Sequence, residues 1–318
     1  MLGSDDVGFV HGGELRRFAR GKRRRDWHQV PAAVGAGAMF AEASLLYLAA
    51  ALAWLRRAWP LTSGVLVVAY AWGLAVGFIR PAGIAAIASL MLLALLCSRT
   101  PNGARGMVLH GLFIVLAVML SAHWVPGFRN PLLLGPVAFT PDAYPFTMYL
   151  NLDKCAVGFA LLLLYKPLRR EAGVTRSLLV GAAGTALAIA LLLPLALHLH
   201  AIRWAPKLPE GLWLWTLNNL LFVAFAEEAL FRGFLQSSLA RWLSGRAGGA
   251  WIAIGVASLA FGIAHHAAGP LMVAFASVAG AAYGLAYRHG GLLASVSAHF
   301  GFNLFHILLF TYPLLMRR

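Results

Sequence analysis

Apolar runs as long as a membrane span recur along the whole chain. A helix that crosses about 30 Å of hydrocarbon needs roughly 20 apolar residues. Seven segments meet this requirement clearly: 31–55, 61–79, 81–97, 107–125, 178–200, 251–266 and 292–313. Three others, 152–165, 212–236 and 271–287, are short, carry ionisable residues or are rich in small residues. The sequence therefore predicts an all-α, polytopic transmembrane helix bundle of about 8–10 spans.

The composition excludes a soluble globular protein. Of the 318 residues, 60% are hydrophobic and only 12% are charged, which is too little charge for the surface of a soluble domain. The net charge of +15 does not indicate a nucleic-acid partner, because the basic residues are scattered between apolar runs. Seven of the 26 lysines and arginines lie in the segment 16–25. A basic arm ahead of apolar spans is typical of a cytoplasmic N-terminus in contact with anionic lipid.

The chain divides into three parts. Residues 1–30 form the basic arm, 31–174 carry few ionisable groups between their apolar runs, and 175–318 carry a dense set. The arm leads into an apolar run without a cleavage-site pattern, so we expect a signal anchor. Five prolines between 126 and 149 predict an ordered surface connection. The excess of arginine over lysine is typical of a GC-rich bacterial genome, and we expect a multi-pass protein of the bacterial inner membrane.

Two adjacent acids lie inside the apolar run 217–235. Glu228 and Arg232 are four residues apart on one helix face and are expected to form an ion pair. Glu227 points about 100° away and has no charge partner in its own helix. Such an intramembrane carboxylate is a candidate general acid or base. The alternative is that both glutamates only satisfy contacts between helices.

Two more polar pairs lie near the ends of apolar spans. Phe261 and His265 are one turn apart, so the ring is expected to pack beside the imidazole, although a lone histidine at a helix end is more often a cap or interface group. His299 and Asn303 also share a face and can donate hydrogen bonds to a common point, as the stabilisation of an oxyanion requires. The alternative is a pair of polar residues that joins helices.

The patterns Glu-Glu-x-x-x-Arg, Phe-x-x-x-His and His-x-x-x-Asn occur in this order on three spans. Their combination resembles the CAAX prenyl endopeptidase and bacteriocin-processing family of intramembrane proteases (CPBP, Abi), over roughly residues 178–313. The resemblance implies an all-helical core at 175–318 with an active site inside the membrane, and makes 31–174 an extension of that core. The residues that it implicates are Glu227, His265, His299 and Asn303 in catalysis, and Glu228, Arg232 and Phe261 in support.

By this resemblance the protein is a hydrolase, an intramembrane glutamic endopeptidase. Glu227 and His265 would activate a water molecule, and His299 and Asn303 would hold the oxyanion. The expected partners are the lipid bilayer and a substrate that is a membrane protein or a hydrophobic peptide. No cofactor is expected.

Two other functions use the same residues. Glu227, His265 and His299 are also ligand types of a catalytic zinc ion with one open position, although the chain has no His-Glu-x-x-His cluster. Buried carboxylates and imidazoles also build proton relays. A transporter, or an immunity or scaffold protein that does not cleave peptides, is therefore the second alternative.

Two polar features lie outside these patterns. The segment 151–154 contains Asp153 and Lys154 at the start of an apolar run, and it is interpreted as a marker of the bilayer interface, where lysine side chains extend toward water. A small functional site is the other interpretation of this segment. A structural role is expected for Glu42.

Overall fold

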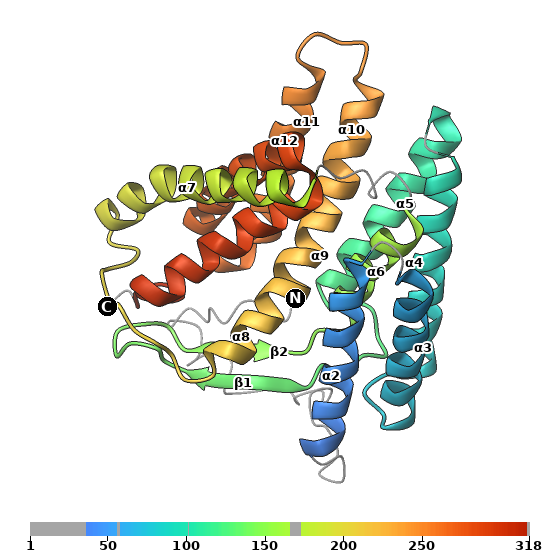
Figure 1. Cartoon of the computed structure of the whole chain (residues 1–318), viewed down its shortest axis with the longest axis horizontal. Helices are drawn as coiled ribbons and strands as arrows, with labels where there is room; N and C mark the ends of the chain where they lie inside the picture. The colour runs from blue at the N-terminus through green and yellow to red at the C-terminus, as the bar shows by residue number, and fades with distance from the viewer. Residues whose placement is uncertain (1–35, 56–57, 101, 166–172, 317–318) are drawn as a thin grey trace, which may run out of the picture.

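The computed structural model describes residues 36–55, 58–100, 102–165 and 173–316. Helices dominate it, and the predicted all-α polytopic bundle is confirmed (Figure 1). Five of the described helices are long and apolar enough to cross a membrane, and two shorter apolar helices accompany them. The basic arm 1–30 lies outside the described residues.

The apolar segments predicted between 31 and 125 are largely helical where the structure describes them. The helices are α2 (Ala36–Ala53), α3 (Trp59–Ala75), α4 (Pro81–Arg99) and α5 (Gly103–Ser121). Proline lies in the first turn of α3 and α4, where its fixed φ suits a helix and its missing N–H breaks no hydrogen bond. Outward side chains such as Val67 and Val115 are exposed although they are apolar. Contact with lipid tails accounts for such a surface.

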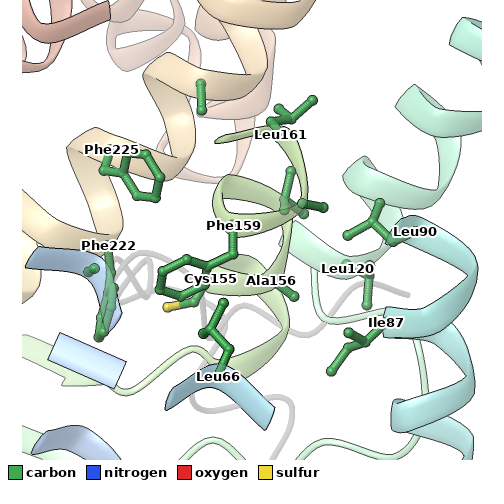
Figure 2. Close-up of a cluster of buried hydrophobic side chains, with 14 of the residues drawn as sticks. Leu66, Ile87, Leu90, Leu120, Cys155, Ala156, Phe159, Leu161, Phe222 and Phe225 are labelled. Carbon is green, nitrogen blue, oxygen red and sulfur yellow. The ribbon is translucent and has the colours of Figure 1, made fainter. Parts of the chain in front are cut away.

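Helix α6 (Leu152–Leu164) lies at the centre of the molecule. Its 13 residues span about 20 Å, too short to cross the hydrocarbon alone. Figure 2 shows Phe159 and Cys155 of α6 between Ile87 and Leu90 of α4 and two phenylalanines of the C-terminal half. The helix is therefore enclosed by protein.

The connection 126–149 is ordered, and it contains a β-hairpin that the sequence did not predict. Strands β1 (Leu132–Val137) and β2 (Phe146–Tyr149) pair antiparallel, with Leu132 opposite Tyr149 and Val137 opposite Phe146. Proline cannot donate a hydrogen bond to a strand ladder, so a proline-rich segment argues against a strand in sequence. An isolated two-stranded ladder has two open edges and can tolerate the missing donor.

The C-terminal half is a second group of helices. It consists of α7 (Val174–His198), a continuous helical rod made of α8 (Leu212–Asn218), η2 (Asn219–Ala224), α9 (Phe225–Glu228), η3 (Ala229–Gln236) and α10 (Ser237–Trp242), then α11 (Gly249–Ala264), η4 (His266–Ala268) and α12 (Pro270–Leu309). Helix α7 runs along α12, while the rod crosses the molecule between α12 and the N-terminal helices (Figure 1). Gly181 and Gly184 of α7 lie so close to α12 that a Cβ atom on Gly184 would be 2.9 Å from the Cβ of Ala298. Small residues allow this close approach of two helices.

Helix α12 combines the two predicted spans 271–287 and 292–313. Its 40 residues would measure about 60 Å if straight, twice the thickness of the hydrocarbon. Gly291 interrupts it with φ 75° and ψ −166°, a conformation open essentially to glycine alone. The break lets the chain fold back, and it places the second half of α12 beside the rod.

Candidate active site

The two glutamates lie in the middle of the rod, where its hydrogen bonding departs from a regular α-helix. Glu227 and Glu228 are in the single α-helical turn α9, and π-helical stretches precede and follow it. π-Helical insertions occur frequently at functional sites because they turn side chains away from the regular 100° spacing. The rod therefore presents its polar side chains toward α6 on one side and α12 on the other.

The predicted ion pair between Glu228 and Arg232 is present. Arg232 Nε lies 3.3 Å from Glu228 Oε2, and neither side chain is exposed. Arg232 also donates to the carbonyl of Gly280 at 3.1 Å and lies 4.7 Å above the Phe261 ring. A buried ion pair needs such additional partners to offset its desolvation. Phe261 thus supports the site by packing on both a cation and an imidazole.

His299 bridges the two glutamates. Its Nδ1 lies 3.0 Å from Glu228 Oε1, and its Nε2 lies 4.0 Å from Glu227 Oε2. The ring stacks on Tyr283 at 4.7 Å with an interplanar angle of 12°. Since Glu228 is paired with Arg232 and can only accept, His299 Nδ1 is assigned as the donor. The Nε2 of a neutral imidazole then presents a lone pair toward Glu227.

Glu227 has a charge partner from another helix. Lys154 Nζ of α6 lies 2.7 Å from Glu227 Oε1. Glu227 has no charge partner in its own helix, as expected. The spacing of residues along one helix cannot predict a partner that is distant in sequence. The interpretation of segment 151–154 as a bilayer-interface marker is wrong for the same reason: Asp153 is fully buried and Lys154 points into the site.

His265 lies at the end of α11, one turn after Phe261 as predicted. The two ring centroids are 4.8 Å apart. His265 Nδ1 lies 2.8 Å from the carbonyl oxygen of Phe261, so Nδ1 carries the proton and Nε2 is left as an acceptor in the neutral ring. His265 can therefore accept a proton from a water molecule in the cavity.

Asn303 lies one turn after His299 and donates a hydrogen bond to Asn219 Oδ1 at 3.3 Å. Asn219 and its neighbour Asn218 were not singled out in the sequence. The sequence did contain an indication of their role, because they are two adjacent amides in the apolar run that leads to Glu227. Polar side chains inside an apolar span are candidates for a functional site. Tyr47 of α2 donates to Asn218 Oδ1 at 3.5 Å.

All four predicted catalytic residues line one cavity of about 660 Å³. The cavity also receives Lys154, and most of its remaining wall is formed by apolar side chains of α5, α7, the rod, α11 and α12. Such a wall with a few convergent polar groups is typical of a binding site for a largely apolar ligand. Residues far apart in sequence thus build one chemical site.

Residues 209–305 match the family model described as Type II CAAX prenyl endopeptidase Rce1-like. The chain therefore carries an Rce1-like segment. Comparison with curated proteins found no match, and neither did comparison with solved structures.

The match confirms the resemblance seen in the sequence patterns. The Rce1-like segment begins just before α8 and ends in the second half of α12, so it contains all seven residues named in the three patterns. Five of the described helices are long and apolar enough to cross a membrane, which supports an integral membrane protein, and the family that the segment matches is one of CAAX-type endopeptidases. Helices α2–α7 lie outside the match.

The β-hairpin and the C-terminal tail lie on one side of the cavity of the Rce1-like segment. Phe146 and Met148 of the hairpin and Tyr312 and Leu314 of the tail contribute to its wall. Outside the cavity, Arg203 pairs with Asp142 through two nitrogens, and its guanidinium lowers the pKa of the Asp142 carboxyl to about 2. The hairpin and the tail therefore form part of the cavity wall on this side.

A zinc site would need Glu227, His265 and His299 to converge on one ion. Within the described residues, no three His, Cys, Asp or Glu side chains form a group able to hold a metal ion. At Glu227, one oxygen already binds the ammonium of Lys154. The described side chains as they lie therefore do not fit a zinc site.

Proposed function

We propose that this protein is an intramembrane glutamic endopeptidase that hydrolyses a peptide bond in a membrane-associated protein or a hydrophobic peptide. The observation that carries the proposal is the convergence of Glu227, His265, His299 and Asn303 on one apolar cavity. Peptide hydrolysis requires a base for water, a proton donor for the leaving amine and dipoles for the oxyanion. The Rce1-like match supports the same class of reaction.

The base would be Glu227 through Oε2. This atom is buried and has no hydrogen-bond partner among the described groups, and it faces His299 Nε2 across 4.0 Å. A water molecule between these two acceptors can donate one hydrogen to each, which leaves its lone pairs free to attack a carbonyl carbon. His265, whose Nε2 is also an acceptor, would share the task of activating the water.

The oxyanion would be held by the amide of Asn303 and by His299 Nε2, once Glu227 Oε2, 4.0 Å away, has passed to that nitrogen the proton that it takes from the water. Attack forms the carbon–oxygen bond and moves one electron pair onto the carbonyl oxygen, while the proton of the water passes to Glu227 or His265. Collapse of the intermediate breaks the carbon–nitrogen bond, and the same proton is transferred to the leaving amine. The products are a new carboxylate end and a new amine end.

The apolar cavity supports a substrate class. Most side chains of α5 and α7 that line the cavity are aliphatic, for example Ile114, Val118 and Leu192. A polar peptide would lose hydration in this cavity without compensation, whereas an apolar segment would not. We propose that the substrate enters from within the bilayer or near it, and that the protein works in a bacterial inner membrane without a cofactor.

The test is terminal-peptide mass spectrometry of membranes from cells that express wild type or Glu227→Gln at matched levels. New peptide termini should appear only with the wild type, since loss of a general base lowers a rate by about 10²–10⁴-fold. Glu210→Gln is the matched control, because Glu210 belongs to the Rce1-like segment but is exposed. Identical termini from wild type and Glu227→Gln, with both proteins inserted, would contradict the proposed function.

A further inference from the structure

The N-terminal extension contributes a charged group to the catalytic cavity. Lys154 lies in α6, outside the Rce1-like segment. Its ammonium is 2.7 Å from Glu227 Oε1. Among the described residues that line the cavity, it is the only lysine or arginine. The family patterns therefore do not account for the one fixed positive charge at the proposed base.

Close packing of α6 on α9 brings this charge into place. Gly158 lies one turn after Lys154 on the same helix face, and a Cβ atom there would be 2.7 Å from Cε1 of Phe225 and 3.2 Å from Cα of Ala226. Only a residue without a side chain permits this approach. The backbone of α6 is thereby held within reach of Glu227, the next residue after Ala226.

A buried polar network fixes the start of α6. Asp153 accepts a hydrogen bond from Asn130 at 3.1 Å and pairs with His123 Nδ1 at 2.6 Å. Asn130 in turn accepts from the backbone N–H of Leu152 at 2.9 Å. The Asp153 side chain also accepts from the N–H of Lys154 at 2.9 Å. These bonds tie the loop after α5 to the first turn of α6, so Lys154 projects from an anchored position.

The two carboxylate oxygens of Glu227 have different neighbours. Oε1 binds the ammonium, and Oε2 faces the Nε2 of His299 across 4.0 Å. The titratable groups that face Glu227 are Lys154 from α6, His265 from the end of α11 and His299 from α12. The ammonium of Lys154 places a full positive charge beside Oε1, and an opposite charge this close favours the ionised carboxylate.

We propose that Lys154 is a positioning residue for the reaction: it holds Glu227 as a carboxylate and directs Oε2 to the water. This inference rests on the proposed function. It assigns a role to the N-terminal helices, which supply a part of the site through α6.

The first experiment compares pH–activity profiles of wild type, Lys154→Met and Lys154→Arg on a cleaved substrate. In Lys154→Met, kcat at neutral pH should fall about tenfold or more, because an opposite charge at this distance changes the protonation of a carboxylate by at least that factor. The acid limb should move to higher pH, while KM changes little. Lys154→Arg keeps the charge and should retain the acid limb of the wild type.

The matched control is Lys207→Met, which removes an ammonium that binds the carbonyl of Phe310 and does not line the cavity. Its acid limb should coincide with that of the wild type. A Lys154→Met enzyme with an unchanged acid limb, or with higher activity than wild type over the whole range, would overturn the proposal.

A second experiment needs no activity. A membrane-permeant carbodiimide should join Lys154 to Glu227, since the carboxylate adds to the reagent and the amine then displaces a urea, with net loss of water. Mass spectrometry should find this amide in wild type and not in Lys154→Arg. Absence of the cross-link in wild type would overturn the contact. The cross-link without Glu227-dependent cleavage would instead overturn the proposed function, and with it the catalytic role of the pair.

Discussion

At the residue scale, the site is a buried cluster in which formal charges cancel. Lys154 and Arg232 carry two positive charges, and Glu227 and Glu228 carry two negative ones, so the cluster is neutral when the imidazoles are neutral. Burying a charge without a partner destabilises a folded protein by roughly several kcal/mol. The two glutamates nevertheless differ. Both oxygens of Glu228 have close partners, with Arg232 Nε 3.3 Å from Oε2 and His299 Nδ1 3.0 Å from Oε1, whereas Oε2 of Glu227 lies 4.0 Å from His299 Nε2.

The oxyanion role of Asn303 gives a prediction at the same scale. Asn303→Ala should lower kcat by about 10²–10³-fold, because one oxyanion donor contributes about that much, and it should change KM little. Steady-state kinetics on the cleaved substrate measures both constants. Asn102→Ala is the control, since Asn102 is exposed at the start of α5 and makes no capping hydrogen bond.

The same substitution separates hydrolysis from a proton relay. A relay needs the carboxylate but no oxyanion donor. If Asn303→Ala keeps full cellular activity while Glu227→Gln abolishes it, the result supports a proton relay and contradicts the proposed oxyanion hole.

At the element scale, α6 is a short helix whose function depends on what surrounds it. It has a buried residue at nearly every position from Leu152 to Leu161, which is unlike the one-sided burial of α4 or α5. A helix that is buried all round belongs in the core of a large assembly. Here it packs against both the N-terminal helices and the rod.

The contact between α6 and α9 predicts the effect of a larger side chain. Gly158→Val should lower stability by about 1–3 kcal/mol, the usual cost of overpacking, and should remove the Lys154–Glu227 cross-link because the helices move apart. Thermal unfolding in detergent and carbodiimide cross-linking check the two effects. Gly64→Val in α3 is the matched control, because a Cβ atom at Gly64 meets nothing within 4 Å. A cross-link of wild-type yield in Gly158→Val would contradict the packing argument.

At the scale of the whole molecule, the two halves share one hydrophobic core. Its largest cluster combines residues of α2–α6 with Phe222, Phe225 and Phe234 of the rod. Phe234 also packs on Tyr165, with ring centroids 4.9 Å apart. Either half without the other would expose the aromatic side chains that the two halves bury together, and it would lose their close packing. The division at 174–175 is thus a division of the sequence patterns, and its status as a domain boundary stays a prediction.

Because the core is shared, we expect neither half to be active alone and the two halves to be active when they are expressed together. Residues 173–318 expressed alone should show no Glu227-dependent cleavage, because they lack Lys154 and the packing of α6. Coexpression with residues 1–172 should restore cleavage, and coexpression with the same fragment carrying Lys154→Met should restore much less. Terminal-peptide mass spectrometry of the membranes measures all three. Full cleavage by 173–318 alone would show that α6 is dispensable.

The sequence by itself determined the helices and the side-chain pairs that lie within one helix. Apolar length predicted helices at the right places, and the spacing of four residues placed Glu228 beside Arg232 and Phe261 beside His265. Helical geometry is local, so such pairs can be read without a fold. The order of the three patterns also led to the Rce1-like family.

Only the tertiary structure decided which helices meet. Lys154 and Glu227 are 73 residues apart, and nothing in either segment indicates the other. The hairpin, the enclosed position of α6 and the hydrogen bond from Asn303 to Asn219 are equally non-local. The physical reason is that packing between helices depends on shape and close approach, as at Gly158, while sequence periodicity reports only which face of a single helix is apolar.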